Sequence, residues 1–265
     1  MAGGVARFTK WDGWMNGDTL IEALDLPASS RVNQRVPKKL LLENGAPTAA
    51  DKRLINDGID ELLWLAALKP TTIGVLEYRD NVREYLEIAV LRLTLRAAAK
   101  ATRVVELVHR AVPYPLLLLT DQTDHGGRPG LSAAHKRWSQ GEAGKTVLEG
   151  DVVAVEWDAE RWPAFRDALA LGKQPRTTLH ALYQGWIDTL LALQAARVTG
   201  VFTVPATAEH AALRRGALQE CAQLDAEIAR LRATAAKEKQ MSRRVELNLE
   251  LKRVEAAQAA ARANL

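Results

Sequence analysis

A β-strand is predicted by residues 86–96, which read LEIAVLRLTLR. Side chains of an extended chain point alternately to two opposite faces, so the pattern separates apolar from polar positions. One face is therefore expected to enter a core, and the other forms a polar, basic stripe. The apolar face carries Leu91, Leu93 and Leu95, and the polar face carries Arg92, Thr94 and Arg96.

The region before this strand is predicted to be mainly helical. Thr48 and Asp51 have the spacing of a capping box with the shorter acid, and apolar residues recur after them at helical intervals. Pro70 ends this helix, and the β-branched residues of 71–76 favour a short strand. Residues 36–42, VPKKLLL, favour a short extended or turn element.

A helix and further strands are predicted after residue 96. Helical spacing of apolar residues covers 97–112 and stops at Pro113. The continuous apolar run at 116–120 is typical of a strand buried on both faces. Residues 131–138 and two β-rich stretches within 145–157 favour three antiparallel strands. These elements predict an α+β fold, with a mixed β-sheet of about five strands and packed helices.

The C-terminal part is predicted to be helical. Residues 176–198 present a broad apolar face, and Gly200 ends that helix. Residues 206–265 contain no proline and are rich in Ala, Leu, Glu, Arg and Lys, as long helices are. Either one continuous arm or a coiled-coil hairpin satisfies this pattern. We favour the hairpin, with its bend at the polar residues 234–240.

An apolar seam along this helical segment predicts a partner-binding surface. A narrow apolar seam on an isolated helix is marginal in water, so another surface has to cover it. In the first part of this segment, apolar or small residues recur at intervals of four and three residues. After residue 240, apolar residues recur at intervals of four. We therefore expect partner contacts at Leu224, Ile228, Leu231, Val245 and Leu249.

Composition limits the class of protein and its compartment. The chain has 265 residues, 48% of them hydrophobic, which can supply a core. We expect an N-terminal extension at 1–35, an α/β body at 36–204 and a helical arm at 205–265. The single cysteine, Cys221, favours a reducing compartment. No apolar run approaches a signal peptide or a membrane span of ~20 residues, so a cytoplasmic location is expected.

The charge balance permits nucleic-acid contact without demanding it. Lys and Arg exceed Asp and Glu by 36 to 32, and the formal net charge is +4. The run HKRW at 135–138 could contact phosphates and stack on a base, or its charges could protect a sheet edge. The basic stripe of residues 86–96 could likewise contact phosphates, or its charges could simply be solvated on the open face of a sheet. Candidate phosphate contacts are Arg92, Arg96, Lys136 and Arg137.

No catalytic, metal or cofactor site is predicted. The chain lacks a GxxxxGK[ST] loop, and its histidines lack metal-ligand spacing and are expected to be structural. A restriction-type nuclease needs an acid two positions before a lysine to hold Mg²⁺, but Ala134 occupies that position relative to Lys136. Asp80, Glu84 and Glu87 lie at or before the strand at 86–96, and a divergent nuclease that uses Glu84 or Glu87 is left as an alternative. The histidines are His109, His125, His135, His180 and His210.

Several short segments resemble one protein family. The chain contains, in order, VPKK at 36–39, EYLEI at 84–88, VHR at 108–110, PYP at 113–115, LSAAHKR at 131–137, LYQGW at 182–186 and ELN at 246–248. In these segments and their order, nearly the whole chain resembles the bacterial domain-of-unknown-function family 4391. The resemblance implies a setting in restriction-like antiviral defence loci, beside helicases and DNA methyltransferases, and it brings no established catalytic residues.

The leading hypothesis is a non-enzymatic accessory subunit of a DNA-directed antiviral defence or restriction-like complex. It would bind a helicase or methyltransferase partner and could guide DNA to it. A direct nucleic-acid-binding protein is the alternative, followed by a divergent metal-dependent nuclease. No cofactor is expected, and the arm could also pair with a second copy in a homodimer.

Overall fold

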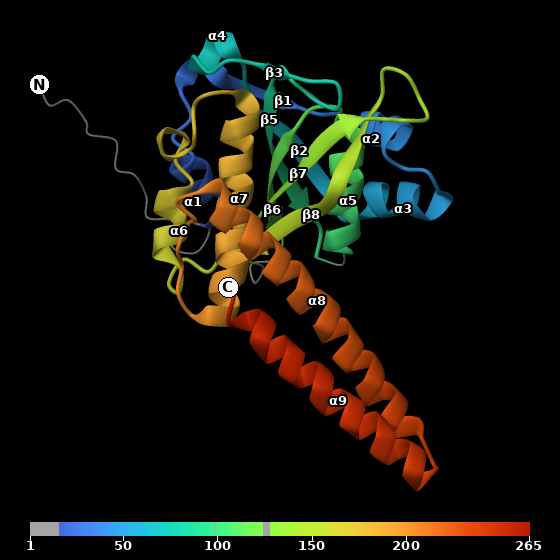
Figure 1. Cartoon of the computed structure of the whole chain (residues 1–265). Helices are drawn as coiled ribbons and strands as arrows, with labels where there is room; N and C mark the ends of the chain where they lie inside the picture. Colours follow the sequence, from blue (N-terminus) through green and yellow to red (C-terminus); the bar gives the residue numbers. More distant parts are fainter. Residues whose placement is uncertain (1–15, 98, 124–127) are drawn as a thin grey trace, which may run out of the picture. The chain divides into compact units, whose positions relative to one another are not determined.

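The computed structural model describes residues 16–97, 99–123 and 128–265 (Figure 1). His125 and the first fifteen residues of the predicted extension lie outside these ranges. The chain divides into two compact units, residues 1–187 and 188–265. The division falls inside one helix, whereas the sequence pattern placed the start of the arm at residue 205.

The first unit contains a six-stranded sheet and a small two-stranded sheet. The large sheet consists of β1 (Arg31–Arg35), β2 (Ile59–Leu68), β5 (Ile88–Leu95), β6 (Leu116–Gln122), β7 (Gly130–Trp138) and β8 (Thr146–Glu156), and the small one of β3 (Tyr78–Arg79) and β4 (Glu84–Tyr85). The helices are α1 (Asn16–Ala23), α2 (Lys38–Asn44), α3 (Ala49–Gly58), α4 (Pro70–Ile73), α5 (Ala101–Ala111), α6 (Pro163–Ala168) and the start of α7 (Leu179–Thr199), with 3₁₀ turns at Ala28–Ser30 and Leu171–Lys173.

The large sheet is mixed, as expected, and within the described ranges it has six strands in place of about five. Its order is β1-β2-β5-β6-β7-β8, and every neighbouring pair is antiparallel except β5 and β6. Parallel neighbours need a crossover connection, and α5 provides it. The α+β class is therefore confirmed.

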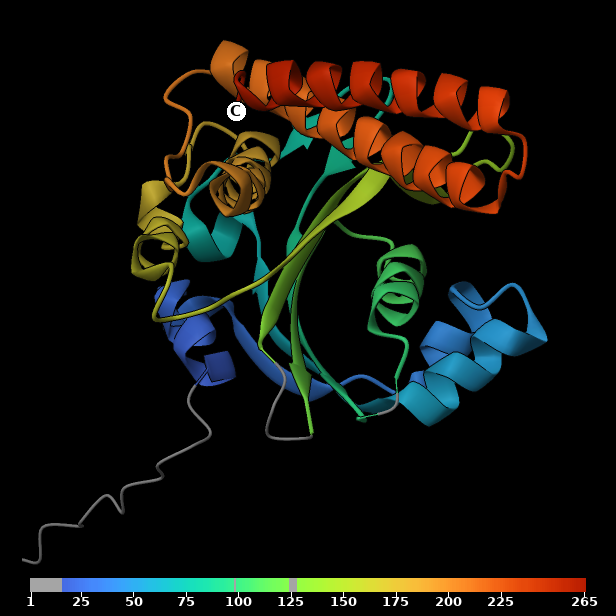
Figure 2. The ribbon, with the colours of Figure 1, turned by 90° about the horizontal axis from the view of Figure 1, so that it is seen from below.

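Helices cover both faces of the sheet (Figure 2). α5, with α2 and α3 beside it, lies on one face, and α1, α6 and the first part of α7 lie on the other. The leucines predicted to share the core face of β5 pack with Val104, Leu107 and Val108 of α5 in one apolar cluster. Leu116 to Leu119 of β6 are all buried, as expected for a strand covered on both sides.

Three local predictions before β5 are wrong. The helix capped by Thr48 ends at Gly58, and the remainder of its apolar run forms β2. β2 lies between two strands and is apolar on both faces, so its pattern also fits a helix. Residues 71–76 contain the end of α4 in place of a strand, and residues 38–44 form a helix in place of an extended or turn element.

The two β-rich stretches around Gly150 belong to one long strand. Gly150 has a φ of +78°, a left-handed conformation that glycine adopts without strain. The register of β8 against β7 shifts there, because Ala133 pairs with Val153 whereas His135 pairs with Glu149. A bulge therefore interrupts the alternation of β8 without ending the strand.

The second unit contains the end of α7 and a hairpin of α8 (Ala208–Lys237) and α9 (Met241–Arg262). The break between α8 and α9 falls within the polar segment predicted for the bend. Antiparallel packing is visible in the ion pairs, which join Arg232 to Glu255 at 2.7 Å and Asp225 to Arg262 at 3.6 Å. The two helices therefore cover part of each other's surface.

Candidate interaction surfaces

Arg92 is held between two carboxylates. Its Nε donates to Asp121 at 2.6 Å, and a terminal nitrogen donates to Asp18 at 2.7 Å. Asp18 comes from α1 and Asp121 from β6, so the guanidinium ties the first helix to the sheet. With a carboxylate on each side, the positive charge of Arg92 is largely compensated.

The side chain of Arg96, which follows β5, reaches the C-terminal end of α3. Its guanidinium donates to the carbonyl oxygens of Asn56 and Asp57, at 3.4 and 3.3 Å, and lies 3.5 Å from the Asp60 carboxylate. These carbonyls belong to the last turn of α3, where a cation is favourable. The half-exposed side chain thus has a structural role that the sequence did not reveal.

Lys136 is buried, with 2% of its surface exposed. Its ammonium donates to the backbone oxygens of His109 and Val112, at the C-terminal end of α5. Burial lowers the pKa of Lys136 to about 8. A phosphate at the protein surface cannot reach this ammonium, so we remove Lys136 from the expected phosphate contacts.

Arg137 points to the opposite face of the sheet, because neighbouring residues of a strand alternate. It is partly buried, and its guanidinium donates to the Trp138 carbonyl oxygen at 3.1 Å. The four predicted phosphate contacts therefore do not form one exposed basic face. Lys136 lies under α5, and the remaining three occupy separate environments.

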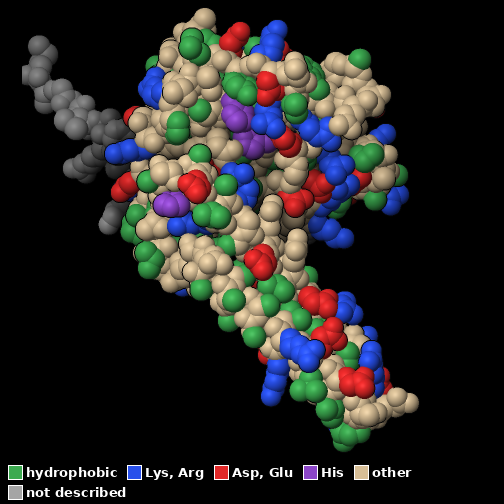
Figure 3. Space-filling model, viewed as in Figure 1, with side chains coloured by type: hydrophobic (Ala, Val, Ile, Leu, Met, Phe, Trp, Pro, Cys, Tyr) green, Lys and Arg blue, Asp and Glu red, His purple; other side chains and the backbone are tan. Residues whose placement is uncertain are grey.

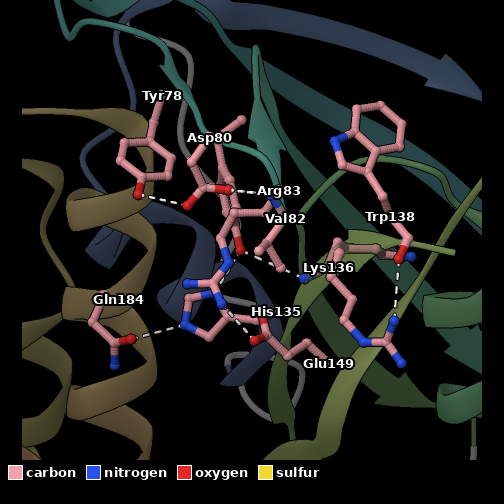
Figure 4. Close-up of polar contacts among 11 residues, drawn as sticks. Tyr78, Asp80, Val82, Arg83, His135, Lys136, Trp138, Glu149 and Gln184 are labelled. Carbon is pink, nitrogen blue, oxygen red and sulfur yellow. Dashed lines mark hydrogen bonds and ion pairs between the residues drawn. The ribbon is translucent and has the colours of Figure 1, made fainter. Parts of the chain in front are cut away.

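His135 belongs to a network of aromatic and polar side chains (Figure 4). Its Nδ1 lies 2.5 Å from the Tyr85 hydroxyl, and its Nε2 lies 2.8 Å from Oε1 of Gln184. A carbonyl oxygen only accepts, so Nε2 carries the proton and Nδ1 accepts from Tyr85. His180 stacks on His135 with ring centroids 5.1 Å apart, and burial lowers the pKa of His180. Figure 3 shows histidine side chains beside charged side chains on the face of the molecule that it draws.

The loop between β3 and β4 is attached to the large sheet by a second set of contacts. Asp80 accepts from the backbone N–H groups of Val82 and Arg83, both at 2.7 Å, and Arg83 donates to Glu149 of β8 at 2.5 Å. Trp138 of β7 donates its backbone N–H to Val82. These contacts hold the small sheet against β7 and β8, which is a structural role.

The acids considered for a nuclease are dispersed. Asp80 accepts a hydrogen bond from Tyr78, Glu84 pairs with Arg79 at 2.6 Å, and Glu87 pairs with Lys69 at 2.9 Å. Among the residues that the structure describes, no three His, Cys, Asp or Glu side chains are placed to hold a metal ion.

The predicted partner contacts divide between the inside and the outside of the hairpin. Ile228 and Leu231 of α8 are buried, and Leu224 is half-buried. Val245 and Leu249 of α9 are 51% and 56% exposed. The inward face of α9 uses a different register, with four-three spacing through Leu247, Leu251, Val254, Gln258 and Ala261.

The outer face of α9 is both apolar and basic. Met241, which is 65% exposed, lies one turn before Val245 and two turns before Leu249, so the three share one face. Lys252 lies three residues after Leu249 on that face. Glu246 and Glu255 form ion pairs with arginines, whereas no ion pair within the described residues involves Arg244, Lys252 or Arg253. Figure 3 shows hydrophobic side chains between charged ones on the hairpin surface.

Comparison with protein families identifies the chain. The model of the family described as a domain of unknown function, DUF4391, matches residues 24–257. The chain belongs to the DUF4391 family. The DUF4391 match includes the whole large sheet, all of α8 and most of α9. No curated protein and no solved structure compared with this DUF4391 chain matches it. No helix in the described ranges has the length and apolar content needed to cross a membrane.

Proposed function

We propose that this DUF4391 protein is a non-enzymatic accessory subunit of a DNA-directed antiviral defence or restriction-like complex in the cytoplasm. In this proposal it binds a helicase or DNA methyltransferase subunit through the C-terminal hairpin. The observation that carries the proposal is the exposed outer face of α9, formed by Met241, Val245 and Leu249. The inward seam of the hairpin is already occupied by its own helices, so this outer face is available to another protein.

The size and chemistry of this face fit a docking contact. Complete burial of a Met, Val or Leu side chain contributes ~1.5–3 kcal/mol, so three neighbouring residues can anchor an interface. Lys252 lies on the same face, and Arg244 and Arg253 flank it without carboxylate partners among the described residues. A complementary partner therefore offers an apolar groove with an acidic rim.

Copurification of the protein with helicase and methyltransferase subunits encoded beside it tests the proposal. The double variant Val245→Glu/Leu249→Glu should lose the partner, because it places two acids in the apolar contact. The variant Ala222→Glu/Ala226→Glu is a matched control, since both alanines are exposed on α8 with the same spacing. Circular dichroism should show equal helix content in both variants. A Val245/Leu249 variant that retains every partner would refute the proposal.

Direct nucleic-acid binding is a second candidate, because Arg244, Lys252 and Arg253 have no ion pair within the described residues. Two phosphate contacts contribute roughly two to the slope of log affinity against log salt concentration. If Lys252 and Arg253 contact phosphates, the variant Lys252→Ala/Arg253→Ala should reduce the slope for duplex DNA by about that amount. An unchanged slope would exclude both residues as phosphate contacts.

A further inference from the structure

Two adjoining cavities open on the side of the sheet that α5 covers. One has a volume of about 210 Å³ and is mainly apolar, and the other has a volume of about 410 Å³ and contains charged residues. They share four wall residues, so they adjoin there. The shared residues are Asn44, Ala111, Pro113 and Tyr114.

The smaller cavity is suited to one large apolar side chain. Its walls include Leu40 of α2, Leu91 of β5 and the rings of Trp64 and Tyr114, whose centroids lie 6.4 Å apart. Leu40 and Tyr114 are 48% and 40% exposed, so apolar surface faces water at this opening. An apolar group that enters the cavity removes this surface from water, which is favourable.

The larger cavity presents charges of both signs. Arg110 and Lys145 contribute positive charge, and Glu43 and Glu84 contribute negative charge. Two positive and two negative side chains make the lining neutral overall, and each of them also has an ion-pair partner that does not line the cavity. The two glutamates disfavour a phosphate backbone, whereas a polypeptide can offer groups of both signs. Charge complementarity therefore favours a peptide as the occupant.

The walls of the two cavities are formed in the free protein. The Trp64 indole donates to the Ala66 carbonyl oxygen at 2.8 Å, which fixes the orientation of its ring. Thr146 donates to the Pro113 carbonyl oxygen at 2.9 Å and joins the start of β8 to the loop that carries Tyr114. A preformed site spares a ligand the cost of ordering the protein.

Some of the exposed apolar residues of the first unit lie at these two cavities. Leu40, Leu86 and Tyr114 are exposed large hydrophobic residues of the first unit, and all three line one or both cavities. Contiguous exposed apolar surface is a mark of protein interaction sites. We propose that the adjoining cavities form a second partner-binding site, which takes a peptide segment with one bulky apolar residue flanked by charges of both signs. This site is separate from the outer face of α9.

Short peptides test the proposal on the full-length protein. The probes are the acetylated and amidated pentapeptides Gly-Lys-Phe-Glu-Gly and Gly-Glu-Phe-Lys-Gly, which offer the charges in both directions, each with an Ala-for-Phe control. Binding is followed by NMR through the indole N–H signals of Trp64 and Trp138, which line the two cavities. At least one Phe peptide should shift both signals at millimolar concentration. Its Ala control should bind about tenfold to a hundredfold more weakly.

Matched variants locate the binding site. Leu40→Glu places a charge at the opening of the apolar cavity and should weaken the Phe peptide at least about tenfold. Leu76→Glu is the control, because Leu76 is an exposed leucine of the same unit that lines neither cavity. Equal binding of Phe and Ala peptides, no shift of either indole signal, or unchanged binding by Leu40→Glu would each overturn the proposal. Self-association that Leu40→Glu abolishes would also overturn it, because a second copy would then be the occupant.

Discussion

His109 should make the stability of the first unit sensitive to pH. This histidine is fully buried on α5, its Nε2 lies 2.9 Å from the Ser132 hydroxyl, and its Nδ1 has no hydrogen-bond partner. Burial, together with the nearby Lys136 ammonium, lowers the pKa of His109 to about 3. The folded protein therefore keeps the ring neutral, whereas the unfolded chain binds a proton below its ordinary pKa of 6.5. Stability should fall as the pH decreases from 6.5 toward 3.

The expected size follows from the two pKa values. A decrease from 6.5 to about 3 corresponds to about 5 kcal/mol at its limit, and to about 2 kcal/mol at pH 5. The free energy of unfolding is measured in urea by tryptophan fluorescence at pH 8 and pH 5. The wild type should lose about 2 kcal/mol more than His109→Gln between these two pH values, because glutamine does not titrate.

Comparing losses between two pH values removes any constant cost of the substitution. His210→Gln is the control, because His210 is exposed on α8, in the second unit. This variant should keep the pH dependence of the wild type. Equal losses of stability for the wild type and His109→Gln would refute the explanation based on the buried ring.

Two further substitutions test contacts in the first unit. Tyr85→Phe removes the hydroxyl that donates to His135 and should lower the free energy of unfolding by ~1–2 kcal/mol, measured by urea denaturation, and an unchanged urea midpoint would contradict this hydrogen bond. Thr48→Ala removes the side chain that accepts the backbone N–H of Asp51 at 3.1 Å and should cost ~1 kcal/mol, whereas Thr48→Ser should retain most of that stability if capping is the reason.

Local sequence patterns predicted a strand correctly where the pattern of apolar residues matched the burial of that strand in the sheet. β5 was predicted because its alternation matches a sheet with one face against α5, and β6 because its continuous apolar run matches burial on both faces. β2 was missed because an apolar run that fits a central strand also fits a buried helix. β1 was missed because its five residues are all exposed and only Val32 is apolar, so no periodicity marks them.

The candidate surfaces required information from distant parts of the chain. Lys136 and Arg137 were both expected to contact phosphates, but neighbouring residues of β7 point to opposite faces, and only the position of α5 determines that Lys136 is the buried one. α9 contains two apolar series, and only its packing against α8 determines which of them faces inward. The two cavities combine α2, β2, α5 and the start of β8, which no local pattern relates.

The parallel pair at the middle of the large sheet also constrains how the protein folds. β5 and β6 are joined by a connection that contains α5, so they cannot meet through a tight turn as antiparallel neighbours can. The two halves of the sheet contain only antiparallel pairs, whereas joining them requires closure of the long connection that contains this helix. We therefore expect early compaction around α5 to unite the N-terminal and C-terminal strands, and changes in the Val104, Leu107 and Val108 face should act on the folding rate.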